Sequence, residues 1–327
     1  MKRTILAATL ALATAVPAVL AHAQSNAPMK VTLAGGSVGG AWSVAGNAIG
    51  ETLRREYPNT SFTYEPGREQ SNILLVSQGR VQLGIAHAQL AGRALSGGEP
   101  FKQPVTNIRA IAVIDPLAAM QVFARQGSDF QSFEQVRRDK KPIRVALNQR
   151  GTMMALAGEE LLAAKGIPAK DVEAWGGKVH YVAYNEGLEM MKNKQVDLIV
   201  NLLAFPSGQV ASATREMPVQ MVGLTPEVQG ALQKSLGMMP IEVPAKTYDF
   251  QPAAVPSATA TVVLVANASM SDEDAGKIVS AMLRNMDFLK QSHAMMRQLD
   301  PAALARVSPL TLHPGAEKAY RAAGALK

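Results

Sequence analysis

Strand-like and helix-like segments alternate along most of this chain, and that order limits the folds open to it. KVTLAG (30–35) has the pattern of a buried strand. SVAGNAIGETLRREY (43–57) follows it, with Ala45, Ile49 and Leu53 at helical spacing. Because short apolar strands followed by amphipathic helices are typical of βαβ units, the pattern predicts a mainly parallel sheet covered by helices.

A second set of segments repeats this order further along the chain. Residues 70–88 (QSNILLVSQGRVQLGIAHA) and 185–203 (NEGLEMMKNKQVDLIVNLL) each run from a polar start through a short helix to a strand that begins Val-Gln-Leu or Val-Asp-Leu. This predicts two α/β lobes of similar plan rather than a solenoid. We expect lobe one to comprise 24–118 and 262–327, and lobe two to comprise 119–261. Two connections would cross between the lobes, and a ligand cleft would lie at that hinge.

The first residues have the features of a secretory signal peptide. Lys2 and Arg3 precede an apolar segment (4–20), and Ala-His-Ala at 21–23 has the small-x-small pattern of a signal-peptidase site. We therefore expect cleavage after Ala23 and export, most simply to a bacterial periplasm. No later apolar run is long enough to span a bilayer, so we expect no direct membrane insertion. The lack of cysteine suits an oxidising compartment.

The formal net charge of +7 is modest for 327 residues. No dense run of Lys and Arg is interleaved with aromatic residues, and export argues against nucleic acid as a partner. We interpret most of the charge as solvated surface. A weak positive field could also help to attract an anionic solute.

Four glycines and a serine separate the first strand from the first helix, in LAGGSVGGAW (33–42). A helix that begins at such a turn offers unpaired amides and the positive end of its dipole, so the turn predicts a small-anion site, with the Ser37 hydroxyl as a further donor. A purely structural turn is one alternative. The other is a dinucleotide site built on AxGxxG at 34–39 with Glu65 as the ribose-binding acid. It is the weaker alternative, because Ala34 replaces the first glycine, and we expect no cofactor.

The second lobe offers a comparable turn, Asn148-Gln149-Arg150-Gly151-Thr152, between a strand and a helix. The Arg150 guanidinium could hold a carboxylate through two parallel hydrogen bonds. If the two turns face one another, they would grip opposite ends of a small polar solute. Further donors follow the second strand of lobe one, namely Arg68, Gln70, Ser71 and Asn72. The alternative for each arginine is a solvated surface charge.

The chain has no arrangement of residues typical of an enzyme. It contains no HExxH, GxSxG or SxxK motif and no pair of histidines at metal-ligand spacing, so we expect no catalysis and no metal site. His87 ends a strand and is a candidate ligand contact, although a histidine in the core or at a cleft rim is the simpler interpretation. A periplasmic hydrolase stays a minor alternative.

Four segments, in order, resemble one known family. They are AGGSVGGAW (34–42), SNILLVSQGRVQLGIAHAQLAGRA (71–94), KNKQVDLIVNLLAFPS (192–207) and LTLHPGAEKAYR (310–321). Together they resemble the TAXI group of solute-binding proteins, which serve tripartite ATP-independent periplasmic (TRAP) transporters.

The resemblance implies a type II periplasmic-binding fold, with two α/β lobes joined by crossing strands around a ligand cleft. It implies a small organic anion as ligand, a dicarboxylate or an acidic amino acid such as glutamate or 2-oxoglutarate, and a TRAP-type membrane permease as partner. Carried over by position, the first lobe would line the cleft with Gly39, Gly40, Ala41, Trp42, Ser71 and Asn72, and the second with Asn148–Thr152, Ala204 and Phe205. The chain departs from the family pattern at 65–72, at 149–152 and at Phe205.

We therefore expect a periplasmic receptor that captures a small organic anion by hinge closure and delivers it to the permease. The alternative is a ligand sensor on the same scaffold that signals to a membrane kinase. Both need the same cleft, so the residues do not separate them.

Overall fold

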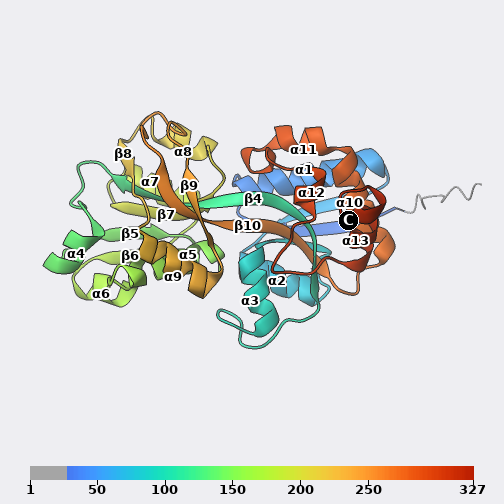
Figure 1. Ribbon diagram of the computed structural model, residues 1–327, viewed down its shortest axis with the longest axis horizontal. Coiled ribbons are helices and arrows are strands. Elements are labelled where there is room, and N and C mark those ends of the chain that lie inside the picture. The colour runs from blue at the N-terminus through green and yellow to red at the C-terminus, as the bar shows by residue number, and fades with distance from the viewer. Residues whose placement is uncertain (1–27) are drawn as a thin grey trace, which may run out of the picture.

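The computed structural model describes residues 28–327, and these form two α/β lobes joined by two long antiparallel strands (Figure 1). The long strands are β4 (Ile108–Arg125) and β10 (Val255–Asn267). Both run from one lobe into the other, so that ten strands form one continuous hydrogen-bonded sheet. The predicted α/β architecture of two lobes joined by crossing strands is confirmed. The expected signal peptide, 1–23, lies outside the described residues.

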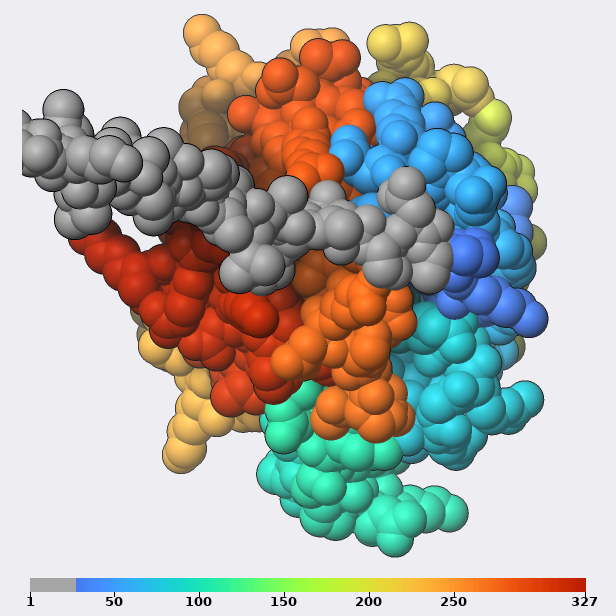
Figure 2. All heavy atoms as spheres, turned by 90° about the vertical axis from the view of Figure 1, so that its right-hand side faces the viewer, coloured from blue at the N-terminus to red at the C-terminus, as the bar shows by residue number. Residues whose placement is uncertain are grey.

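The first lobe combines the beginning and the end of the described chain. Its strands β1 (Lys30–Gly35), β2 (Ser61–Pro66) and β3 (Leu83–His87) follow the order β2-β1-β3-β10-β4, and β1 pairs in parallel with both neighbours. Its helices are α1 (Ala41–Glu56), α2 (Glu69–Ser77), α3 (Ala88–Ser96), α10 (Asp272–Arg284), α11 (Met286–Ser292), η1 (Ala294–Met296), α12 (Pro301–Leu304) and α13 (Pro314–Ala322). Early and late segments lie side by side on the end of this lobe (Figure 2).

The second lobe is built from the middle of the chain. The sheet continues from β4 through β7 (Leu198–Leu203) and β5 (Arg144–Leu147) to β6 (Lys178–Tyr181), while β8 (Val219–Met221) pairs with β4 and β9 (Met239–Val243) pairs with β10. Its helices are α4 (Phe133–Asp139), α5 (Met153–Ala164), α6 (Ala169–Ala174), α7 (Tyr184–Lys192), α8 (Gly208–Ala213) and α9 (Pro226–Leu236). The expected lobe boundaries fall inside β4 and between Thr261 and Val262 of β10, and they stay a prediction.

Strand β4 has a nearly continuous apolar sequence because both of its faces are covered. From Ile108 to Ala124, β4 is buried except at Arg109, Pro116 and Leu117, which are half-buried. A strand that is covered on both faces gains from apolar side chains at every position rather than at every second one. The pairing of β4 with β10 shifts register beside Asp115, which is opposite Val262. This irregularity, a bulge, lies where the strands pass between the lobes.

The glycines of the first strand-to-helix turn have separate structural reasons. A Cβ at Gly35 would lie 2.3 Å from the Tyr64 hydroxyl, and a Cβ at Gly46 would lie 2.6 Å from the same ring. Glycine at both positions therefore lets Tyr64 of β2 pack directly on β1 and α1, where its hydroxyl donates to the carbonyl of Gly36 at 2.8 Å. Gly39 has a φ of 76°, a conformation that side chains other than glycine rarely adopt.

Candidate functional site

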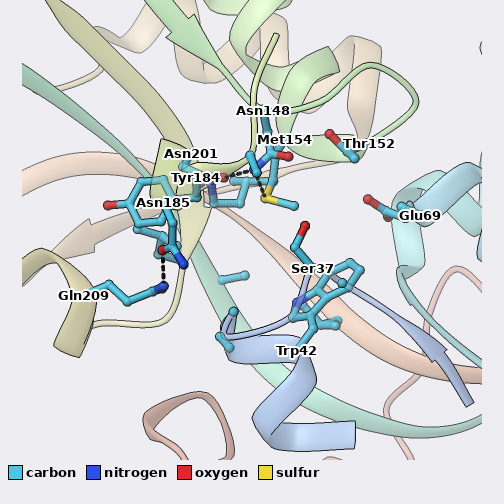
Figure 3. Close-up of a pocket in the computed structure, with 18 of the residues that line it drawn as sticks. Ser37, Trp42, Glu69, Asn148, Thr152, Met154, Tyr184, Asn185, Asn201 and Gln209 are labelled. Atoms are coloured by element: carbon cyan, nitrogen blue, oxygen red, sulfur yellow. Dashed lines mark hydrogen bonds between the residues drawn. The ribbon is translucent and has the colours of Figure 1, made fainter. Parts of the chain in front are cut away.

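A cavity of about 370 Å³ lies between the lobes and is lined by both of them. Strands β1 and β2 of the first lobe, and β5, β6 and β7 of the second, end at this cavity, and the segment after each of them forms part of its wall. Ligands of open α/β sheets commonly bind at the carboxyl ends of strands for this reason. Ser37 and Trp42 lie on one side and Asn148, Tyr184 and Asn185 on the other (Figure 3).

The first-lobe wall is centred on the beginning of α1. Gly40 is the N-cap residue, and no side chain caps the helix. The first-turn amides of Ala41 and Trp42 have no acceptor within an α-helix, so they are available to a ligand together with the exposed Ser37 hydroxyl. The Trp42 ring is held by His87, whose ring centroid lies 5.3 Å from that of the indole.

The second-lobe wall is centred on the beginning of α7. Ala183 is its N-cap residue, and again no side chain caps the helix. Tyr184 and Asn185 of the first turn line the cavity, and Asn185 Oδ1 accepts from Gln209 Nε2 at 2.6 Å (Figure 3). The cavity thus meets uncapped helix N-termini from both lobes, each carrying the positive end of a helix dipole.

A pair of buried amides adds a donor to the second-lobe wall. Asn148 Nδ2 lies 3.4 Å from Asn201 Oδ1 and 3.4 Å from Met154 Sδ (Figure 3). Asn201 Oδ1 also accepts from the amide of Leu202 at 3.0 Å. The Asn201 Nδ2 group has no acceptor among the described residues, although the side chain is buried and lines the cavity. This donor is therefore open to a ligand in the cavity, which can supply the acceptor.

Glu69, the first residue of α2, connects the two lobes at one edge of the cavity. Its side chain is fully buried. Oε1 accepts from the backbone amide of His87 at 2.6 Å and lies 3.1 Å from His87 Nδ1, and Oε2 accepts from the amide of Met153 in the second lobe at 2.9 Å. Beside it, the amide of Gln70 donates to the carbonyl of Gly151 at 2.9 Å. The lobes are therefore in direct contact here.

The charged groups of the cavity differ in how they are paired. Arg68, at the N-cap of α2, is exposed, and its side chain makes no hydrogen bond or ion pair with the described residues. Asp115 is buried among the crossing strands, and desolvation raises its pKa to about 7. His293 also lines the cavity, and burial together with Arg297 lowers its pKa, so the imidazole is neutral at pH 7.

The structure brings half of the expected site residues to the cavity. Those that line it are Ser37, Gly40, Ala41, Trp42, Arg68, Asn148, Thr152 and Ala204. The cavity wall does not include Gly39, Gln70, Ser71, Asn72, His87, Arg150, Gly151 or Phe205. Whether the lining residues contact a solute stays a prediction.

Several residues outside the wall have structural roles. Asn72 is fully buried, and its amide donates to the carbonyls of Gly35 at 3.1 Å and Ile85 at 3.0 Å, so it connects the ends of β1 and β3. His87 lies behind Trp42 and Glu69 and orients both. A position just after a strand is therefore not enough to place a polar side chain in the cavity. Such a side chain can instead turn inward and form hydrogen bonds with backbone groups.

Arg150 does not face the cavity. Its guanidinium carbon lies 3.5 Å from the centroid of the Tyr181 ring, and its Nη1 lies 3.4 Å from Glu159 Oε1. The side chain is 69% exposed. The stacking surface and the carboxylate hold Arg150 on the outside of lobe two, which corrects the expected carboxylate clamp.

We expect Arg150→Ala to leave solute affinity within twofold of wild type, because the guanidinium already has partners away from the cavity. Isothermal titration with any solute that binds wild-type protein checks this. A tenfold loss of affinity would show that Arg150 reaches the solute and that its stacking on Tyr181 does not persist.

Tyr184, Asn185, Asn201 and Asp115 are among the lining residues that the sequence did not predict, and two signals could have found these four. Tyr184 and Asn185 follow β6, and Asn201 lies near the end of β7, so the expectation that ligands bind at the carboxyl ends of strands also covers them. Asp115 is the single acid in the 18-residue strand IRAIAVIDPLAAMQVFAR. An isolated carboxylate in an apolar strand is costly to bury without a cation, which is a signal of a functional role.

Within residues 28–327 no group of three or more His, Asp or Glu side chains is placed to hold a metal ion. The same part of the chain contains no helix that is both long enough and apolar enough to cross a bilayer.

Comparison with solved structures shows the fold of periplasmic binding proteins. The chain aligns with periplasmic binding protein BugD with a TM-score of 0.54 and 15% identity, over 82% of this chain and 86% of BugD. It aligns equally well (TM-score 0.54, 11% identity) with PhnD1 from Prochlorococcus marinus, solved in complex with methylphosphonate, over 82% of this chain and 90% of that one. A structure described as a periplasmic transporter gives a TM-score of 0.54 at 11% identity, over 90% and 92% of the two chains.

These alignments confirm the predicted two-lobed periplasmic-binding fold, and at such identities they show the fold alone. The family itself is shown by sequence. The match covers residues 33–324, from the last part of β1 to the end of α13, and therefore nearly all of the described chain. On this evidence the chain belongs to the NMT1-like family.

Proposed function

We propose that this chain is a periplasmic solute receptor that captures a small organic acid in the cleft between its lobes and delivers it to a membrane permease. The observation that carries the proposal is the convergence on one cavity of the uncapped N-termini of α1 and α7, one from each lobe. Each helix end contributes free amides and about half a positive charge, which favours an anionic guest.

Other groups at the cavity support an acid rather than a neutral solute. The Asn201 Nδ2 group is a donor on the cavity wall that lacks an acceptor among the described residues, and Arg68 is an exposed cation that lacks a counter-ion among them. Because both are donors, they match the oxygens of a carboxylate, sulfonate or phosphonate. The methylphosphonate complex of PhnD1 shows that this fold can hold an oxyanion of that kind.

Capture would use the crossing strands as the hinge. Small residues gather at the middle of both strands, with Ala118 and Ala119 in β4 and Ala258 and Ala260 in β10. Rotation about this pair changes few packed contacts and brings the two helix ends together around the solute. The resemblance to the TAXI group supports a TRAP-type permease as the membrane partner, which would recognise the closed form.

Isothermal titration of the purified protein tests the proposal. The panel contains carboxylates, sulfonates and phosphonates, with and without an amino group, and glucose as a neutral control. We expect at least one acid to bind with 1:1 stoichiometry and a Kd below 100 μM, and glucose to give no heat. If no acid of any kind binds, the proposed function is wrong.

Asn201→Asp tests whether the cavity itself is the site. The substitution keeps the size of the side chain but replaces the free donor with a negative charge, so we expect the affinity for the acid to fall at least thirtyfold. Asn193→Asp, on the exposed end of α7, is the matched control and should bind as wild type. Equal affinities for the two variants would place the binding site elsewhere.

A further inference from the structure

The cavity contains an acidic group that a simple anion would not use. Asp115 is 4% exposed, lies at the register shift of β4 and lines the cavity together with Ala118 and Val262 of the crossing strands. These strands run between the two walls that carry the helix N-termini (Figure 3). An anion-binding cleft thus has a carboxylate built into its floor.

The Asp115 carboxylate is only half satisfied by the protein. Oδ1 accepts from the amide of Leu117 at 3.0 Å, whereas Oδ2 has no hydrogen-bond partner among the described residues. No lysine or arginine of the described chain forms an ion pair with it, and the ionisable group that acts on its charge is His87. Leaving a buried carboxylate without a cation is costly, and such groups are normally paired.

Glu69, a buried acid at the same cavity with a structural role, provides a comparison for Asp115. Both of its oxygens are occupied by protein donors, from His87 on one side and Met153 on the other. Asp115 lacks such a set of donors, although both side chains are more than nine-tenths buried. The difference indicates that the partner of Asp115 comes from outside the protein.

We propose that the solute is zwitterionic, an amino acid or an amino derivative of a sulfonic or phosphonic acid, with its ammonium group on Asp115 and its acidic group against the amides of α1 and α7. The inference rests on the proposed function and names its substrate class. An ammonium group donates up to three hydrogen bonds and carries a positive charge. It can therefore donate to the free Asp115 oxygen and neutralise the buried carboxylate, which an acid without an amino group cannot do. A zwitterionic solute then matches the cavity, in which the amides of α1 and α7 are donors on the walls and Asp115 is an acceptor on the floor.

The desolvation that raises the pKa of Asp115 to about 7 gives the interaction a defined pH dependence. An ammonium group favours the ionised carboxylate, so binding should tighten as pH rises from 6 to 8, by about tenfold if Asp115 alone titrates. A protonated Asp115 that donated to an oxyanion would give the opposite slope.

The surroundings of Asp115 supply few other titrating groups. His87 acts on the Asp115 charge. Arg68, Glu69, Glu186 and His293 line the same cavity, and His293 is already neutral at pH 7. Strands β7, β8 and β10 and helix α12, which contact β4, carry no ionisable side chain. Helix α10 also contacts β4. Its Lys277 is paired with Glu273, its Arg284 is paired with Glu56, and Asp272 and Asp274 lie in its first turn.

Matched pairs of solutes that differ only in the amino group test the inference by titration calorimetry. The pairs are glutamate and glutarate, aspartate and succinate, taurine and ethanesulfonate, and 2-aminoethylphosphonate and ethylphosphonate. We expect the amino member of the preferred pair to bind at least tenfold tighter at pH 8. Equal binding of the two members, or tighter binding of the plain acid, would overturn the inference and leave the proposed function intact. If none of the eight solutes binds, both the inference and the proposed function are wrong.

The variant Asp115→Asn tests recognition of the amino group without disturbing the fold. The asparagine keeps the oxygen that accepts from Leu117 and the size of the side chain, so the variant should fold and bind plain acids. We expect the preference for the amino member to fall below threefold and the pH dependence between 6 and 8 to disappear. Asp129→Asn, on the exposed surface of lobe two, is the control and should keep the tenfold preference. Retention of that preference in Asp115→Asn would contradict the role of Asp115.

Discussion

Glu69→Gln is expected to weaken solute binding at least tenfold and to lower Tm by about 5 °C. The Glu69 carboxylate accepts from the amides of His87 and Met153, one in each lobe, and lies beside the His87 ring. A glutamine side chain must turn its NH₂ group towards one of these two N–H groups, because only one of its terminal atoms is an acceptor. Each hydrogen bond to a buried charge contributes about 1.5–3 kcal/mol, so the loss affects both folding and closure.

The matched control is Glu65→Gln, at the exposed end of β2, which should change neither Tm nor affinity. Small-angle scattering adds a readout that simple destabilisation would not change. Since Glu69 joins the lobes through Met153, the solute-free Glu69→Gln protein should be more extended than the wild type at a temperature where both are folded. A variant with wild-type affinity and dimensions would show that the Glu69–Met153 contact has no part in closure.

Gly40→Asp is expected to reduce affinity for an acidic solute at least thirtyfold while leaving Tm nearly unchanged. Gly40 is the N-cap residue of α1 and has a φ of −82°, which aspartate adopts without strain. Asparagine and aspartate are good N-cap residues, so the new carboxylate would accept from the first-turn amides and stabilise the helix by a few tenths of a kcal/mol. It would thereby occupy the amides that we assign to the solute, and it would repel the acidic group.

Gly40→Asp distinguishes an effect on the binding site from an effect on folding, because it should lower solute affinity while slightly stabilising α1. A Cβ at position 40 would lie 3.1 Å from the carbonyl oxygen of Ser37, so a small local shift accompanies it. Gly230→Asp, where a Cβ meets nothing within 4 Å, is the control for an added aspartate elsewhere and should bind normally. If Gly40→Asp retained full affinity, the α1 amides would not contact the solute.

The fold could be predicted from the sequence because its determinants are local and repeated. Buried strands such as KVTLAG and LGIAH are mostly apolar, and each is followed by a helix with one apolar face. The connections between lobes were harder to place, since Pro116 in β4 reads as a break in a strand. Strand β4 nevertheless continues through Pro116, because its pairing with β10 shifts register beside Asp115 and accommodates the proline.

The site could be predicted only in part, because position along the chain does not fix the direction of a side chain. The first turn of α1 was identified through its glycines, since backbone amides point along the helix axis whatever the side chains do. Arg150 turned outward because the Tyr181 ring and Glu159 lie beside it, and these neighbours come from other segments. Asp115 was missed for the same reason, because its importance depends on what surrounds it after folding.

A crystal structure of the full chain with the tightest-binding acid from the panel tests the central claim most directly. We predict the solute between the N-termini of α1 and α7, with its acidic oxygens within hydrogen-bond distance of the amides of Ala41 or Trp42 and of Asn201 Nδ2. A solute bound outside the cavity, or inside it with its acidic group turned away from both helix ends, would contradict the account.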